Sequence, residues 1–183
     1  MRSSASGWRH SPQPDMVEVR PLDPAEASAS STIGQRVLAL NNDHAMELSW
    51  LDGDRLAELV GRAFVARRIG AVDAFLLAFD QDAAYDSPNF LWFRSRYRCF
   101  VYIDRVVVAG AARGRGYARR LYDDLFAQAR RASHDRSVCE VNRDPPNPAS
   151  DAFHAALGFA EVGSARLFDG MKTVRYLARP LIG

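Results

Sequence analysis

The chain has 183 residues, with 24 basic against 22 acidic side chains and a net charge of +2. Hydrophobic residues make up 48% and charged residues 25% of it, which is typical of a soluble domain and excludes a wholly disordered or collagen-like chain. The sequence has no run of about 18 apolar residues and no apolar signal-peptide core near its start, so we expect a cytoplasmic protein.

The basic residues are almost all arginine, because Lys172 is the only lysine. Either a GC-rich genome favours arginine codons, or some arginines bind phosphate through their planar set of donors. A net charge of +2 does not indicate a nucleic-acid surface, and we expect neither a nucleic-acid nor a membrane partner. Cys99 and Cys139 have no metal-ligand spacing, so no metal site is expected.

The first 32 residues are rich in small and polar residues and have almost no hydrophobic periodicity. They predict a disordered N-terminal extension over 1–32, followed by a single folded domain over 33–183.

The folded part is predicted to contain both strands and helices. β-Branched and aromatic runs predict strands at 37–40, 65–69, 73–79, 99–108, 138–141, 160–168 and 171–178. Helical spacing and start signals predict helices from about Asp52, from Ser87-Pro88, from about Gly116, and from Ser150 to Gly158. This mixture indicates an α+β fold.

The most informative segment lies between the Val-rich strand and the helix near Gly116. It reads Arg-Gly-Arg-Gly-Tyr-Ala over residues 113–118. Glycines let backbone N–H groups turn toward a ligand, and the N-terminus of the following helix attracts an anion. Arg119 and Arg120 add positive charge nearby. The pattern predicts a phosphate-binding turn; the alternative is a glycine-rich connection with solvated arginines.

This segment resembles the Arg/Gln-x-x-Gly-x-Gly/Ala acyl-coenzyme A signature of the GNAT N-acetyltransferase superfamily, with Arg113, Gly116 and Ala118 at the matching positions. Further along the chain, Asn147 and the run Phe-His-Ala-Ala-Leu-Gly-Phe over 153–159 are similar to that family's Asn…Leu-Tyr-x-x-x-Gly-Phe segment. The resemblance covers about residues 33–177.

The resemblance implies a GNAT-like central sheet of six to seven strands, mixed but mostly antiparallel, twisted and flanked by helices, with a splayed acyl-coenzyme A cleft between strands 4 and 5. It also implies an acetyl-coenzyme A-dependent N-acetyltransferase. The acceptor would be the amine of a small molecule or peptide, attacking directly in a ternary complex. Homodimers are common among proteins that resemble this one.

The resemblance further implies a cofactor site built mostly from backbone. Amides of residues 114–118 would hold the pyrophosphate, Arg113 would fix the loop, and the strand before it would pair with the pantetheine arm. The implied residues are Val106, Val107, Val108, Arg113, Gly114, Arg115, Gly116, Tyr117, Ala118 and Asn147.

The family's usual general-acid tyrosine falls at His154 in this chain. His154 either protonates the leaving thiolate, or is a spacer while water does so, or is a structural histidine. Tyr122 belongs to the apolar stripe of its helix and is interpreted as a core residue.

Two carboxylates are candidate general bases. Asp104 lies in the strand that would line the acyl site, on the same predicted face as Val106 and Val108, and beside Arg105. Glu140 lies in the neighbouring strand. A charged residue in an apolar strand either faces a polar cleft or pairs with an arginine, and both interpretations stay open here.

Residues 87–98 carry several aromatics that either roof the acceptor site or pack in the core, and Arg94 or Arg98 could attract an acidic acceptor. The alternative to an enzyme is a non-catalytic acyl-coenzyme A-binding module, which the missing tyrosine favours.

Overall fold

In the computed structural model, residues 18–167 and 172–181 are described, and seven strands of this part form one sheet. Its order is β1-β2-β3-β4-β5-β7-β6, and every neighbouring pair is antiparallel except β4 and β5. The strands are β1 (Val19–Pro21), β2 (Val65–Ile69), β3 (Ala74–Asp80), β4 (Val101–Val108), β5 (Arg136–Asp144), β6 (Ala160–Leu167) and β7 (Lys172–Pro180). The predicted α+β class and mostly antiparallel seven-stranded sheet are confirmed.

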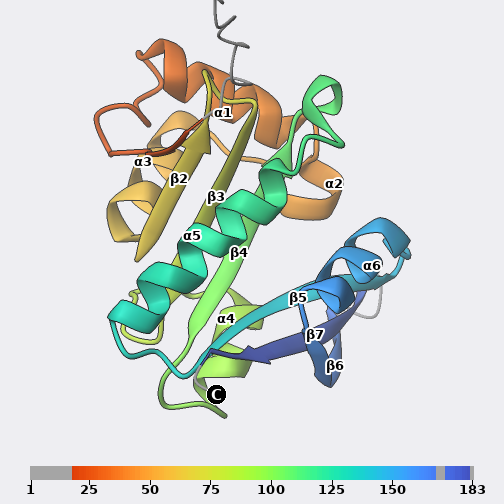
Figure 1. The fold of residues 1–183 in the computed structure, drawn as a ribbon. Helices are drawn as coiled ribbons and strands as arrows, with labels where there is room; N and C mark the ends of the chain where they lie inside the picture. Colours follow the sequence, from red (N-terminus) through yellow and green to blue (C-terminus); the bar gives the residue numbers. More distant parts are fainter. Residues whose placement is uncertain (1–17, 168–171, 182–183) are drawn as a thin grey trace, which may run out of the picture.

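Helices cover both faces of the sheet (Figure 1). On one face lies α5 (Tyr117–Arg131), whose apolar stripe packs on the strands. On the other face lie α1 (Thr32–Asn42), α3 (Gly53–Arg62) and α4 (Pro88–Arg94). The remaining helices are α2 (Ala45–Leu48), the 3₁₀ turn η1 (Gly110–Ala112) and α6 (Pro148–Ala156). Within the described residues, no helix has the length and apolar character needed to cross a bilayer.

The sheet begins earlier in the chain than the sequence predicts. β1 pairs with β2, Leu22 is 2% exposed and donates its N–H to the Ala66 carbonyl, and Glu26 forms an ion pair with Arg68 at 2.6 Å. The predicted disordered extension is therefore wrong for residues 19–32. A three-residue strand shows too little alternation to be recognised. Residues 1–17, also assigned to that extension, lie outside the described part.

The strand predicted at residues 37–40 is wrong as well, because this segment belongs to α1. Ser31 caps the helix by accepting the Gly34 N–H, and the buried Val37 and Leu40 are three residues apart on one helical face. A four-residue apolar run does not distinguish a buried strand from a helix. The other predicted helices and strands form within a few residues of the predicted limits.

Two irregularities shape the centre of the sheet. β4 and β5 pair only at Val101–Ser137 and Tyr102–Val138, after which the two strands diverge (Figure 1). Opposite β3, the register shifts so that Asp104 has no partner, which makes it the extra residue of a β-bulge. The predicted cleft between the fourth and fifth strands is confirmed.

Gly163 in β6 offers a direct test of the packing beside this cleft. A Cβ atom there would meet the Trp92 ring at 2.5 Å, and that ring is stacked on Tyr176 with centroids 4.0 Å apart. Gly163→Ala is therefore expected to destabilise the fold by about 1–3 kcal/mol in urea denaturation. Gly61→Ala in α3 meets nothing within 4 Å and is the control, with an expected gain of about 0.5–1 kcal/mol. Equal effects of the two changes would contradict this packing.

Candidate active site

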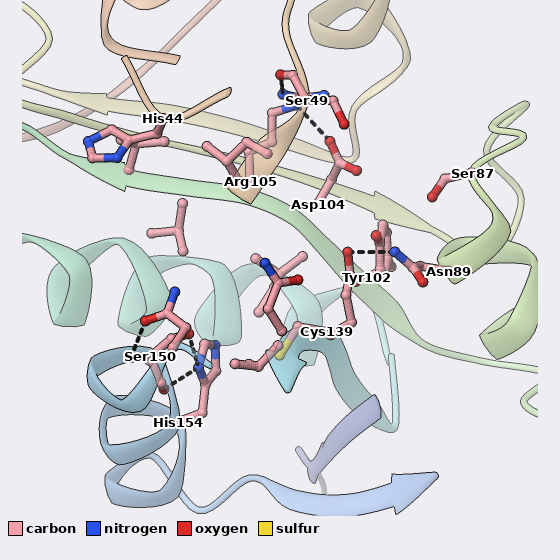
Figure 2. Close-up of a pocket in the computed structure, with 18 of the residues that line it drawn as sticks. His44, Ser49, Ser87, Asn89, Tyr102, Asp104, Arg105, Cys139, Ser150 and His154 are labelled. Carbon is pink, nitrogen blue, oxygen red and sulfur yellow. Dashed lines mark hydrogen bonds and ion pairs between the residues drawn. The ribbon is translucent and has the colours of Figure 1, made fainter. Parts of the chain in front are cut away.

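A cavity of about 800 Å³ opens where β4 and β5 diverge. Its walls come from both strands, from α5 and α6, and from the segments 48–51 and 85–89. Figure 2 shows Ser49, Asp104 and Arg105 along one side and Ser150 and His154 on the opposite side. The cavity therefore brings together residues that are far apart in the sequence.

Six of the ten predicted cofactor-binding residues line this cavity: Val106, Val107, Val108, Arg113, Ala118 and Asn147. The other four do not line it. Gly114, Arg115 and Gly116 form the turn beyond one end, and the side chain of Tyr117 is buried in the core under α5.

The turn before α5 has the geometry of an anion site. Gly114 and Gly116 both have φ of +75°, and a Cβ built on either would meet nothing within 4 Å. Gly116 caps α5 without any side-chain hydrogen bond, so the first-turn N–H groups of this 15-residue helix are left for a ligand. The turn thus fits a phosphate group, which would rest against open backbone and the positive end of the helix.

The backbone of β4 is open toward the cleft beyond Tyr102. Ala109 donates its N–H to the Asp73 carbonyl on the β3 side. Because hydrogen-bonded and non-hydrogen-bonded pairs alternate in an antiparallel ladder, Val107 also directs its backbone groups to β3, whereas Val106 and Val108 direct theirs into the gap.

Glu140, in β5, has one carboxylate oxygen in use and one that is buried without a partner. Its Oε1 accepts a hydrogen bond from the Asn89 amide at 2.8 Å, whereas Oε2 has no hydrogen-bond partner. Burial, reinforced by the nearby negative charge of Asp104, raises the pKa of the Glu140 carboxyl to about 7. A buried carboxylate with a free oxygen and a near-neutral pKa is suited to general-base chemistry.

Asn89 is itself held in place, because its Oδ1 accepts a hydrogen bond from the Tyr176 hydroxyl at 3.1 Å. Tyr176 lies opposite Glu140 in the β5–β7 ladder. The chain Tyr176–Asn89–Glu140 therefore fixes the orientation of the carboxylate. The Tyr102 hydroxyl and the positive charge of Lys172 lower the pKa of this carboxyl against the larger effect of burial.

Asp104 differs from Glu140 in that both of its oxygens are occupied. Tyr85 donates its hydroxyl to Oδ1 at 2.7 Å and Arg105 donates Nε–H to Oδ2 at 3.0 Å, with both charged side chains under 8% exposed. Burial raises the pKa of the Asp104 carboxyl, and Arg105 opposes that rise. The geometry favours the ion-pair interpretation over general-base chemistry.

The bulge also overturns the predicted face of Asp104. Val106 and Val108 pack against the α5 side of the sheet, whereas Asp104 contacts Tyr85 in the cluster on the other side. The prediction assumed strict alternation, and a β-bulge inserts one residue and reverses it.

His154, in α6, is buried and forms hydrogen bonds through both ring nitrogens. Nδ1 lies 2.8 Å from the Ser150 carbonyl oxygen, which only accepts, so Nδ1 carries the proton. Nε2 of the neutral ring then accepts the Tyr122 hydroxyl at 2.8 Å. Burial lowers the pKa of His154, so the neutral ring predominates at pH 7 and has no proton free for the cavity.

We expect His154→Phe to destabilise the fold by about 1–3 kcal/mol, because the Tyr122 hydroxyl would be left buried without a partner. Urea denaturation of the single variants and of the Tyr122→Phe/His154→Phe double variant measures this. The double variant should lose less than the sum of the two single changes. Additive losses would contradict a hydrogen bond between the two side chains.

The aromatics of residues 87–98 pack in the core rather than roofing the cavity. Phe90 and Phe93 are fully buried, and Arg94 stacks over the Phe90 ring at 5.6 Å. From this segment only Ser87, Pro88 and Asn89 line the cavity, so neither Arg94 nor Arg98 is placed to attract an acceptor.

Sequence reasoning missed the groups that orient these side chains. Asn89 and Tyr176 are 51 and 36 positions from Glu140, and no local pattern connects them. Tyr122 lies in the core as predicted, but its hydroxyl reaches His154 and its side chain also lines the cavity.

Comparison with known proteins gives a family match and many structural neighbours. The model of the Acetyltransferase (GNAT) family matches residues 40–159. No curated protein matches the sequence. The ribosomal-protein-S18-alanine N-acetyltransferase from Escherichia coli is similar in structure, with 15% identity, a TM-score of 0.63, and coverage of 91% of this chain and 94% of the other.

Two further structures show the same likeness. Ard1 from Thermoplasma volcanium has 13% identity and a TM-score of 0.66, with coverage of 91% of this chain and 98% of the other. The putative acetyltransferase yncA from Salmonella typhimurium, solved with its cofactor acetyl-CoA, has 22% identity and a TM-score of 0.63, with coverage of 91% and 94%. At these identities the likeness shows a shared fold.

Proposed function

Since the chain belongs to the GNAT acetyltransferase family, we propose that it transfers an acetyl group from acetyl-coenzyme A to a primary amine by direct attack, with Glu140 as general base. The observation that carries this proposal is the free, buried Oε2 of Glu140 inside the cleft between β4 and β5.

Acetyl-coenzyme A would supply an activated acetyl thioester. Its pyrophosphate fits the open turn at Gly114 and Gly116 and the first-turn amides of α5, where Arg113 lies at the edge of the cavity. The free backbone groups of Val106 and Val108 would pair with the pantetheine arm as an added strand, and Asn147 would contact the same arm from α6.

Glu140 would act first on the acceptor. An amine arrives at neutral pH as an ammonium ion, which has no lone pair for attack. Oε2 takes one of its protons, and a carboxyl pKa of about 7 lets Glu140 be both ionised before the step and protonated after it. A backbone N–H of β4 would stabilise the negative charge that develops on the acetyl carbonyl oxygen.

His154 would act in this scheme as a holder of the Tyr122 hydroxyl, and water would protonate the leaving thiolate. The occupied ring nitrogens support this assignment. If His154 were instead the acid, His154→Phe would lower turnover far more than cofactor affinity.

The proposed function is tested by following thiol release from acetyl-coenzyme A with a broad panel of primary amines, together with calorimetric titration of coenzyme A. Amine-dependent thiol release is expected. Tight coenzyme A binding without turnover of any amine would refute the proposed enzyme. It would favour the second candidate, a non-catalytic acyl-coenzyme A-binding module, which is supported by the lack of a free proton on His154.

A further inference from the structure

Trp50 stands out among the described residues as a large aromatic that is exposed at the cavity. The exposed large hydrophobics are Met46, Trp50, Leu91 and Val162, and of these only Trp50 lines the cavity. It is 65% exposed.

The backbone on both sides of Trp50 is fixed by side chains. Buried Asn41 and Arg105 both donate to the Ser49 carbonyl at 3.1 Å. Asn42 makes two bonds to Leu51, accepting its N–H and donating to its carbonyl, both at 2.9 Å.

These four bonds hold an irregular backbone. Ser49 has φ of +75°, a conformation that a residue with a Cβ rarely adopts. Arg105 is fixed in turn by its ion pair with Asp104, the bulge residue of β4. The backbone of the loop 49–51 is therefore tied to the strand that lines the cleft, and this places Trp50 at the cavity.

Arg55 and Tyr85, which line the cavity near this loop, are engaged with neighbouring acidic side chains. Arg55 is bound by Glu58 at 2.6 Å and lies 3.7 Å from Asp86, while Tyr85 donates to Asp104. Among the described buried side-chain atoms that have no partner, only Oε2 of Glu140 belongs to a residue that lines the cavity. The same cavity thus offers an unpartnered carboxylate oxygen for an ammonium group and, elsewhere on its wall, apolar surface from Leu48, Trp50 and Leu51.

We infer that the acceptor is a small primary amine with a flat apolar body, an arylalkylamine in chemical class, whose ring stacks on Trp50 while its amine meets Glu140. This inference rests on the proposed function. Asn41 and Asn42 are positioning residues in it, because they do not line the cavity and bind the loop that carries Trp50.

The first test compares acceptors and variants in the thiol-release assay. We expect kcat/KM for 2-phenylethylamine to exceed that for ethanolamine, spermidine or a peptide with a free N-terminus by at least about tenfold. Trp50→Ala should remove that preference through KM, while leaving turnover of ethanolamine and coenzyme A affinity within about twofold. Trp50→Phe should retain most of the preference.

Met46→Ala is the matched control for these variants, because it removes a 90% exposed side chain that does not line the cavity.

The second test needs no turnover. Titration with 2-phenylethylamine should quench the tryptophan fluorescence of the wild-type chain and not that of Trp50→Phe. If no amine is acetylated but this quenching is seen, the proposed function fails and the assignment of the binding site stands. An equal loss for all acceptors in Trp50→Ala, a preference for spermidine or the peptide, or a dimer in sedimentation that Trp50→Ala dissolves would each overturn the inference.

Discussion

Glu140→Gln is expected to lower kcat by about 10²–10⁴-fold while leaving coenzyme A affinity unchanged. Glutamine keeps the shape of the side chain and can still accept the Asn89 hydrogen bond, but it takes no proton from an ammonium ion. The measurement is thiol release with the best acceptor, together with calorimetry for coenzyme A. Glu161→Gln on β6, outside the cavity, is the control.

The pH profile gives this prediction a second readout. Only the ionised carboxylate acts as a base, so kcat/KM of the wild-type chain should rise through a pKa of about 7 and level off above it. The residual activity of Glu140→Gln should lack this rise. A wild-type profile that is flat between pH 6 and pH 8 would count against Glu140.

The raised pKa of Glu140 also makes the stability of the fold depend on pH. The folded-state pKa of Glu140 lies above the ordinary value of 4.5, so the fold favours the neutral form. This shift contributes to the free energy of unfolding, and the contribution is fully present below the ordinary pKa of 4.5 and is lost as the pH rises through about 7. Glu140→Gln stays neutral, so its melting temperature relative to wild type should increase as the pH rises from about 4.5 to about 7 and stay at that higher level above pH 7. A variant that loses activity and gains stability there has not simply unfolded.

Gly116→Val is expected to weaken coenzyme A binding by at least about 100-fold, which corresponds to about 2.7 kcal/mol. The residue has φ of +75°, which a β-branched side chain adopts only under strain, and the open space beyond its Cα is where a phosphate would lie. Calorimetry measures the affinity, and thermal unfolding measures the strain separately, at about 1–2 kcal/mol.

Gly110→Ala is the matched control for this turn. Gly110 lies in the same connection, its Cβ would meet nothing within 4 Å, and its φ is not in the left-handed region. Its coenzyme A affinity should stay within about twofold of wild type. If Gly116→Val binds coenzyme A as tightly as Gly110→Ala, the pyrophosphate does not rest on this turn.

The geometry of the turn before α5 was predictable from sequence because it is local. Gly114, Gly116 and the start of α5 lie within a few residues, and backbone conformation, helix polarity and ligand access all depend on that short stretch. The limits of β2 and the start of α3 are confirmed and those of β3 are met to within one residue, since strong periodicity or a capping residue defines each of them.

The surroundings of Glu140 and Arg105 were not predictable in the same way, because their contacts form only through the tertiary fold. Asn89 reaches Glu140 across 51 positions, and Arg105 reaches Asn41 across 64. The wrong face assigned to Asp104 has a different cause. A bulge is set by the register of two strands, and neither strand shows it in its own sequence.

The short pairing of β4 and β5 also affects the cohesion of the molecule. The strands β1 to β4 form one half of the sheet and β5, β7 and β6 the other, and the ladder between the halves spans two residue pairs. Any molecule that fills the gap as an additional strand supplies main-chain bonds to both halves that the polypeptide itself does not make. A ligand bound in the cleft as a strand would therefore extend the main-chain pairing between the two halves beyond the two residue pairs that join them.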